Sequence, residues 1–199
     1  MKYYLDITLL PDTEITLGFI WFKVYQQVHI ALAENKNYQN KSDIGLSFPQ
    51  YFEKDKTFPL GNKLRLFSSS KDRLEKLAIT SWLKRFVEHT HITTIKTVPE
   101  SVTEYVCFSR QQFTTNLSRL AKRRAKRHEE TFEQALQYYA SFEDEQAKLP
   151  YINVKSLSKN EQFKLFIDGE RRCLAKNSNF TCYGLSGREE GKQTTVPWF

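Results

Sequence analysis

Residues 3–35, YYLDITLLPDTEITLGFIWFKVYQQVHIALAEN, contain the change of hydrophobic period that decides the fold. Over residues 3–10 every odd position is apolar, which is the period-two pattern of a β-strand. A proline then ends the strand, and Asp12 or Thr13 can cap the element that follows. Over residues 14–35 the apolar side chains recur at three- and four-residue spacing, as on one face of a helix: Leu17, Ile20, Trp21, Val24, Val28, Ala31 and Leu32. The segment predicts a strand followed by an amphipathic helix.

The pattern continues to residue 98 with two strands, a helix and a further strand. The strands are predicted at 44–49, 63–67 and 91–98. Ser70 is placed to cap the helix, whose inward face would consist of Leu74, Leu77, Ala78, Trp82, Leu83 and Phe86. The order strand, helix, strand, strand, helix, strand is that of the ferredoxin-like fold, which RNA-recognition modules share. Because many unrelated functions use this fold, it does not define the function.

Pro99 marks a predicted boundary between a ferredoxin-like domain at 1–99 and a second domain at 100–199. The second domain is expected to contain a long basic helix at 116–141 together with antiparallel strands. These strands are predicted at 105–108, as a hairpin at 164–174, and at 179–185 and 195–199. We therefore predict the α+β class, with an N-terminal ferredoxin-like (RRM-like) domain and a C-terminal domain that has an arginine-rich helix and antiparallel strands.

The composition is that of a globular protein with an excess of positive charge. The chain has 199 residues, 40% of them hydrophobic, and a formal net charge of +7. Its three cysteines form no CxxC pair, which argues against a disulfide framework and against a zinc site. The N-terminus has no signal-peptide pattern, and no apolar run reaches the roughly 18–20 residues of a membrane span. We expect a cytoplasmic protein with no membrane partner.

The segment 119–127, RLAKRRAKR, has six basic residues in nine. On a helix with about 100° per residue, five of them share an arc of about 140°: Arg119, Lys122, Arg123, Lys126 and Arg127. The positive charges on such a face repel one another unless an anion lies against them. The planar guanidinium of arginine matches the geometry of phosphate oxygens. We expect a phosphate-bearing partner; a solvated face or an acidic protein partner is the alternative. Phosphate contacts would supply affinity without reading a base sequence.

His29 is the histidine with the clearest chemical interpretation. On the predicted first helix it lies about 120° from the centre of the apolar stripe, so it should reach a groove or the surface. An imidazole that titrates near neutral pH can remove the proton of a ribose hydroxyl. The sequence has no P-loop, GxGxxG or GxSxG motif, no metal-ligand spacing and no carboxylate cluster for two-metal chemistry. If the chain cuts RNA, we therefore expect a route without metal or cofactor, in which the 2′-hydroxyl attacks its own phosphate.

Taken in order, the motifs resemble the CRISPR-associated endoribonuclease family of type I-F systems, which trims precursor CRISPR RNA at the base of a repeat hairpin. The resemblance spans nearly the whole chain. Its marks are YLDI at 4–7, His29, GLSFP at 45–49, SRQQ at 109–112 ahead of the basic helix, SLS at 156–158, FKLF at 163–166, FTCYGLS at 180–186 and VPWF at 196–199. Each motif is weak by itself, but their order and spacing are specific.

The resemblance implies the catalytic roles. His29 would accept the proton of the attacking 2′-hydroxyl, Ser156 would hold the ribose at the cleavage site, and Tyr183 would orient the histidine. Ser158 would support the same pocket and its RNA. Without the resemblance, the two serines would be read as ordinary polar residues and Tyr183 as a core aromatic.

The resemblance also implies the RNA contacts. Arg110 and Gln112 would read base edges near the foot of the stem, and Phe163 would stack on the terminal base pair. Four residues of the basic face would lie along the major groove of the stem and contact phosphates: Lys122, Arg123, Lys126 and Arg127. Arg119, on the same face, is also expected to bind RNA. The chain departs from the family at Lys126, where arginine is usual, and at 187–193, where the segment is longer than the usual turn.

The resulting hypothesis is an endoribonuclease that cleaves CRISPR repeat hairpins in precursor crRNA and stays bound to the 3′ hairpin of the mature crRNA. Its other partners would be the remaining subunits of a type I-F surveillance complex. Two alternatives remain open. The first is a subunit that holds a structured RNA without cutting it, and the second is a DNA-binding protein that uses the basic helix in a duplex major groove.

Overall fold

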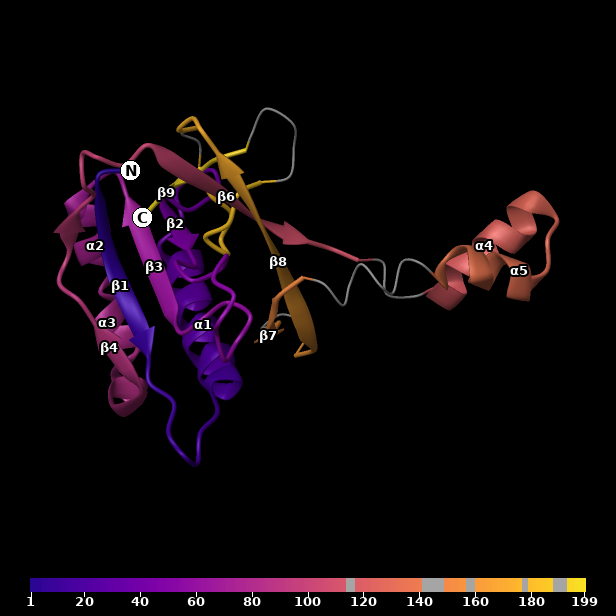
Figure 1. The fold of residues 1–199 in the computed structure, drawn as a ribbon, viewed down its shortest axis with the longest axis horizontal. Coiled ribbons are helices and arrows are strands. Elements are labelled where there is room, and N and C mark those ends of the chain that lie inside the picture. The colour runs from indigo at the N-terminus through magenta and orange to yellow at the C-terminus, as the bar shows by residue number, and fades with distance from the viewer. Residues whose placement is uncertain (114–116, 141–148, 157–159, 177–178, 188–192) are drawn as a thin grey trace.

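The structure, a computed structural model, describes residues 1–113, 117–140, 149–156, 160–176, 179–187 and 193–199, and these form two antiparallel sheets (Figure 1). The elements up to residue 99 are β1 (Tyr3–Leu9), α1 (Leu17–Glu34), β2 (Ile44–Ser47), β3 (Lys63–Ser68), α2 (Lys71–Leu77), α3 (Ile79–Trp82), the 3₁₀ helix η1 (Lys84–His89), β4 (Thr90–Ile92) and β5 (Lys96–Thr97). Those that follow are β6 (Glu104–Gln111), α4 (Leu117–His128), α5 (Phe132–Tyr138), β7 (Tyr151–Lys155), β8 (Gln162–Arg172) and β9 (Val196–Trp198).

The first sheet has the strand order β2-β3-β1-β4, and every pairing in it is antiparallel. β5 also pairs with β1, so the strand predicted at 91–98 is divided into two short strands on the same neighbour. Together with the intervening helices, this is the ferredoxin-like arrangement that the order of elements predicted. The α+β class with antiparallel sheets is confirmed.

Helix α1 buries the face that its apolar spacing predicted. All seven residues of the predicted stripe are buried, and Tyr25 joins them with no exposed surface. The predicted caps are wrong, because the N-cap is Thr16. Asp12 instead closes the preceding turn, where its carboxylate accepts hydrogen bonds from the backbone N–H groups of Glu14 and Ile15 at 2.8 and 2.7 Å. A short Asp side chain readily bonds nearby backbone in this way.

The single helix predicted after Ser70 is divided into α2, α3 and η1. Ala78 takes the left-handed conformation, with a φ of 47°, and this ends α2 one residue before α3 begins. The inward spacing of the apolar residues is kept, since Leu74, Leu77 and Leu83 are buried. The prediction that Ala78 faces inward is wrong, because this residue is exposed at the break that the apolar spacing does not reveal.

The second sheet has the order β7-β8-β6-β9, again with antiparallel pairs. The predicted hairpin at 164–174 is wrong, because β8 runs through Gly169 without turning. A β-carbon at Gly169 would lie 2.9 Å from the Phe108 ring and 3.0 Å from the Tyr51 ring. The glycine therefore serves a close approach of two aromatic rings and not a turn.

The long basic helix predicted at 116–141 is also divided. Glu129 has a φ of 53° between α4 and α5, and Thr131 begins α5 with a capping box. In this box the Thr131 hydroxyl accepts from Gln134 N at 3.2 Å, and the Gln134 side chain accepts from Thr131 N at 2.9 Å. In Figure 1, α4 and α5 stand apart from the two sheets. The basic face of α4 is therefore carried on a helical hairpin.

The two sheets share one hydrophobic core. Phe48, which follows β2, meets Phe108 of β6 edge to face with ring centroids 5.2 Å apart. The Tyr51 hydroxyl donates to Ile167 O at 3.1 Å and accepts from Gly169 N at 3.2 Å.

The division into domains at 1–99 and 100–199 stays a prediction. In the described part of the chain, none of the helices has the length and apolar character that crossing a bilayer requires.

The segment 179–187 is not a regular strand, contrary to the prediction for 179–185. It is attached to β2 and the residues before it: Phe180 and Ser42 exchange two backbone hydrogen bonds of 2.9 Å, and Leu46 N donates to Gly184 O at 2.8 Å. Two glycines permit this contact. A β-carbon at Gly45 would lie 2.3 Å from the Phe180 ring, and Gly184 has a φ of +70° with Leu46 Cγ 2.3 Å from the position of its missing β-carbon.

We predict that Gly184→Ala lowers the free energy of unfolding by about 2–4 kcal/mol, because it combines a left-handed backbone with overpacking. Urea unfolding would measure the change. Gly18→Ala is the matched control: Gly18 is helical and its β-carbon would meet Phe58 at an ordinary 3.4 Å, so we expect no loss or a gain of about 0.5–1 kcal/mol. Equal stabilities of Gly184→Ala and wild type would contradict the packing described.

Candidate functional site

His29 lies half-buried on α1 and is held from two directions by the 179–187 segment. Its Nδ1 is 2.9 Å from the carbonyl oxygen of Cys182. The Tyr183 ring stacks on the imidazole with centroids 4.2 Å apart and an angle of 2° between the planes. The ring of His29 is therefore fixed in both position and orientation.

The contact with Cys182 also decides which nitrogen carries the proton of neutral His29. A carbonyl oxygen can only accept, so Nδ1 must donate, and the lone pair of the neutral ring is left on Nε2. Burial lowers the pKa of His29 below its ordinary 6.5; the Cys182 carbonyl opposes this, and the charge of Arg110 lowers the pKa further. At neutral pH, His29 is thus a neutral imidazole with a basic Nε2.

Arg110 of β6 lies between two aromatic rings. The centre of its guanidinium is 5.0 Å from the Phe163 ring and 5.2 Å from the Tyr183 ring. Its Nε is buried and has no hydrogen-bond partner among the described residues. A buried unsatisfied N–H is costly unless a ligand completes it. The structure thus brings together four of the predicted residues: His29, Arg110, Phe163 and Tyr183.

Ser156 directly follows β7, and its backbone N–H donates to Glu161 O at 2.8 Å. The preceding residue, Lys155, is bound to α1 through Gln26. Gln26 Oε1 accepts from Lys155 N at 2.9 Å, and Gln26 Nε2 donates to Lys155 O at 3.0 Å. Sequence analysis missed Gln26, since a glutamine next to an apolar stripe gives no signal that distinguishes a buried amide from a solvated one.

Tyr25 and Thr181 stabilise the part of the segment that carries Cys182 and Tyr183. The buried Tyr25 hydroxyl donates to Tyr183 O at 2.9 Å. The Thr181 hydroxyl donates to Leu185 O at 3.0 Å and accepts from Tyr183 N at 3.3 Å. Neither residue was predicted, because their partners are backbone atoms, and a sequence pattern does not show those.

The basic face of α4 is exposed as predicted: Arg119, Lys122, Arg123, Lys126 and Arg127 all lie on the surface. Arg124 points elsewhere. Its Nε is 2.6 Å from the Glu130 carboxylate, and its guanidinium lies 3.7 Å from the centre of the Tyr138 ring. Arg124 therefore joins α4 to α5, whereas the other five form one cationic surface.

Two of the predicted residues are not part of this arrangement. Gln112 is exposed just after the end of β6, and no contact places it beside His29. Ser158 lies outside the described residues. The described residues hold no group of three His, Cys, Asp or Glu side chains that could bind a metal ion.

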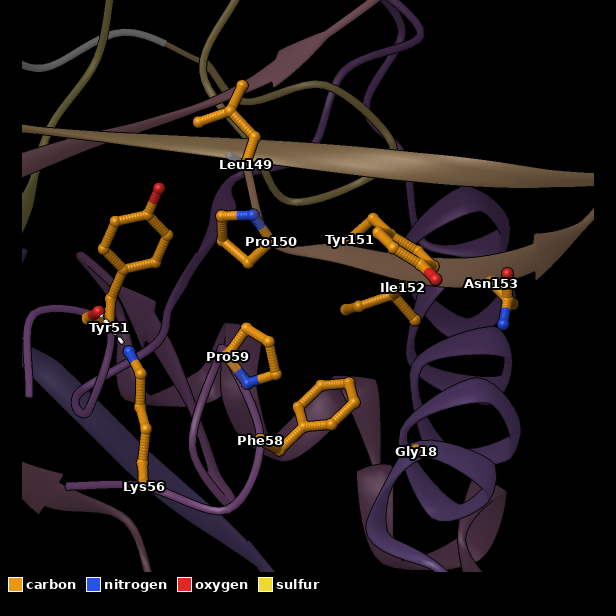
Figure 2. A pocket seen from close by; sticks show the side chains of 10 residues that line it. All are labelled: Gly18, Tyr51, Lys56, Phe58, Pro59, Leu149, Pro150, Tyr151, Ile152 and Asn153. Atoms are coloured by element: carbon orange, nitrogen blue, oxygen red, sulfur yellow. Dashed lines mark hydrogen bonds between the residues drawn. The ribbon is translucent and has the colours of Figure 1, made fainter. Parts of the chain in front are cut away.

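A cavity of about 570 Å³ lies between the start of α1, the 51–59 segment and the start of β7 (Figure 2). Tyr51, Phe58 and Tyr151 are among its lining residues. Lys56, at its edge, donates from Nζ to the backbone oxygens of Gln50 and Tyr51. None of the residues around His29 lines this cavity, so the cavity is separate from the site.

A ferredoxin-like sheet together with an exposed cationic helix is a combination found in α+β proteins that bind nucleic acid. The comparison with known families is more specific. The model of the family described as CRISPR-associated protein (Cas_Csy4) matches residues 4–199, and the chain belongs to this family.

Two curated relatives match over their whole length. Both are named CRISPR-associated endonuclease Cas6/Csy4; one is from Escherichia coli (strain UTI89 / UPEC) and is 32% identical, and the other is from Pseudomonas aeruginosa (strain UCBPP-PA14) and is 34% identical. Each alignment covers 100% of this chain and 100% of the relative. The alignment with a solved structure titled "An RAMP protein binding different RNA substrates" covers 98% of this chain and 99% of that one, with 13% identity and a TM-score of 0.34.

We predict that His29 titrates with a pKa below 6.5 in the folded protein, since burial and Arg110 both disfavour the imidazolium. Arg110→Ala should raise this pKa without restoring 6.5, because the burial remains. An NMR titration of the His29 ring protons would measure both values. Lys96→Ala removes an equal charge from β5 and should leave the pKa unchanged. A wild-type pKa at or above 6.5 would contradict the electrostatics of the site.

Proposed function

We propose that this chain is an endoribonuclease that cleaves CRISPR repeat hairpins in precursor crRNA. Membership of the Cas_Csy4 family and two full-length relatives that are named endonucleases support the activity. The observation that carries the mechanism is the bond from His29 Nδ1 to Cys182 O, because it leaves Nε2 of the neutral ring as a base. A base of this kind can remove the proton of a hydroxyl group.

The proposed reaction is an internal transfer of the phosphate. His29 Nε2 takes the proton of the 2′-hydroxyl, the 2′-oxygen forms a bond to the adjacent phosphorus, and the bond from phosphorus to the 5′-oxygen breaks. The 5′-oxygen takes up a proton and leaves as a hydroxyl, and the imidazolium of His29 gives up the proton that it took, so that no net proton is consumed. The products are a 2′,3′-cyclic phosphate and a 5′-hydroxyl, and the step uses no metal ion. Because the nucleophile belongs to the substrate, the protein has mainly to orient it.

Three residues around His29 are assigned supporting roles. Ser156 holds the ribose of the cleaved nucleotide, and Tyr183 orients the imidazole through ring stacking while the Cys182 carbonyl fixes its tautomer. Ser158 supports the same RNA pocket, as the family resemblance implies. Stacking leaves Nε2 available for the ribose hydroxyl.

Arg110, Gln112 and Phe163 are assigned to the foot of the RNA stem. Phe163 stacks on the terminal base pair, and Arg110 reads a base edge with the guanidinium that now lies over the Phe163 and Tyr183 rings. The unsatisfied Arg110 Nε supports this role, since a base or phosphate oxygen would complete it. Gln112, exposed at the end of β6, would add a second contact to a base.

The exposed face of α4 is assigned to the phosphates of the stem. Its five cations supply affinity over both strands without reading sequence. Because several phosphate contacts slow the dissociation of the RNA, we propose that the protein keeps the cut hairpin at the 3′ end of the mature crRNA. The bound protein would then join the other subunits of a surveillance complex. The folded stem, and not a linear sequence, is the substrate.

We predict that wild-type protein cuts a type I-F repeat hairpin in EDTA, and that His29→Ala reduces the rate by at least about 10²-fold, because general base catalysis contributes about 10²–10⁴-fold. A gel of end-labelled hairpin would measure both rates. His91→Ala removes an exposed histidine of β4 and is the matched control. Binding without cutting by wild type would favour the non-catalytic alternative, and equal rates for wild type and His29→Ala would overturn the assignment of the base.

We predict that Arg123→Ala and Arg127→Ala each weaken binding of the hairpin and lower the salt slope of the binding constant by about one unit. Filter binding at several salt concentrations would measure the slope. Arg85→Ala, an exposed arginine on η1, should leave the slope unchanged. An unchanged slope in the α4 variants would show that these side chains do not meet phosphate. Equal affinity for duplex DNA of the same sequence would favour the DNA-binding alternative.

A further inference from the structure

Gln26 is a buried polar side chain in the middle of α1, with 9% of its surface exposed. Its amide makes a two-point contact with the backbone of Lys155: the oxygen accepts from the N–H at 2.9 Å and the nitrogen donates to the carbonyl at 3.0 Å. The amide oxygen and the amide nitrogen of Gln26 therefore both bond to the same residue, Lys155 of β7.

The register of β7 explains why Lys155 needs this partner. β7 is the outer strand of its sheet and pairs with β8 alone. Ile167 N donates to Pro150 O, so position 150 directs its backbone groups to β8, and positions 152 and 154 do the same because antiparallel pairs alternate. Lys155 therefore directs its N–H and C=O away from β8. Gln26 satisfies both groups, as a neighbouring strand would.

This contact sets the spacing between the two elements that carry the site. Ser156 is the next residue after Lys155, and His29 is three residues after Gln26 on α1, which corresponds to about 4.5 Å along the axis. Among the residues described, no other hydrogen bond joins α1 to β7. The remaining contact between these elements is apolar packing, which resists sliding less than a directional pair of bonds.

We propose that Gln26 is a positioning residue for the cleavage reaction: its amide holds the end of β7 on α1 and so places Ser156 opposite His29. This inference rests on the proposed function, in which Ser156 holds the ribose and His29 takes its proton. Gln26 acts through the backbone of Lys155 and does not itself touch the reacting atoms. A misplacement of about 1 Å between a base and its substrate can reduce a rate by about 10²-fold.

The test is single-turnover cleavage of the repeat hairpin by Gln26→Met, which keeps the length of the side chain and removes both polar atoms. We expect the rate to fall by about 10- to 100-fold, with the affinity for a hairpin that has a 2′-deoxy cleavage site changed less than about twofold. The matched control is Gln27→Met, one residue along the same helix, which should cut at the wild-type rate. Equal rates for Gln26→Met and wild type would overturn the inference.

A double-mutant cycle separates positioning from general loss of structure. If Gln26 acts by placing Ser156, then Gln26→Met should cost little in a Ser156→Ala background, because the contact that it positions is already absent. Losses that multiply would show that Gln26 does not act through Ser156. Failure of the proposed function and failure of this inference give different results. If the wild-type protein does not cut, the proposed function is wrong; if wild type and Gln26→Met cut at the same rate, only the role of Gln26 is wrong.

Gln26→Glu provides a second readout that does not depend on how well Gln26→Met folds. An ionised Glu can accept from Lys155 N–H but has no proton to donate to Lys155 O, and protonation of its carboxyl restores the donor. The rate relative to wild type at the same pH should therefore increase as the pH falls from about 8 to about 5, towards a carboxyl pKa that burial raises. A ratio that does not change with pH would contradict the hydrogen-bonding role.

Discussion

Phe180 lies with its ring against Gly45, where a β-carbon would be 2.3 Å from the ring, and this contact holds the segment that carries Cys182 and Tyr183. It holds the 179–187 segment on β2 with the help of the paired backbone bonds between Phe180 and Ser42. The same segment presents the Cys182 carbonyl and the Tyr183 ring to α1. A larger residue at Gly45 would separate the segment from β2 and so free the imidazole. The packing of the Phe180 ring on Gly45 thus contributes to the position of the two groups that contact the His29 ring.

The surroundings of His29 also set its protonation state and its tautomer. Burial and Arg110 lower its pKa, and the carbonyl that receives the Nδ1 proton leaves the lone pair on Nε2. Because folding lowers this pKa, His29 adds no cost to the folded state above pH 6.5, and the free energy of unfolding declines as the pH falls from 6.5 towards the lowered pKa. Arg110 acts twice around this site: its charge adds to the effect of burial in lowering the pKa of His29, and its buried Nε has no hydrogen-bond partner among the described residues.

Hydrophobic periodicity was sufficient to predict the ferredoxin-like part, because the buried stripe of α1 and the alternation of β1 are local properties of the chain. The errors share a physical cause. Gly169 was read as a turn, although it makes room for the rings of Phe108 and Tyr51, and the break at Ala78 depends on a left-handed residue that no spacing reveals. Within the site, His29 was indicated by its position on the predicted helix and Arg110, Phe163 and Tyr183 by the family resemblance, and the structure brings these four together. Gln26 and the Cys182 carbonyl could not be predicted, because their roles arise from backbone partners far away in the sequence.

The central claim is that the nucleophile belongs to the RNA and that the protein supplies a base for it. The most direct measurement is cleavage, in EDTA, of a repeat hairpin with a single 2′-deoxyribose at the nucleotide that precedes the scissile phosphate, together with identification of the ends of the ribose product. The account predicts no cutting of the deoxy hairpin with its binding intact, and a 2′,3′-cyclic phosphate on the all-ribose product. Cutting of the deoxy hairpin, or a product that ends in a 3′-hydroxyl, would contradict it.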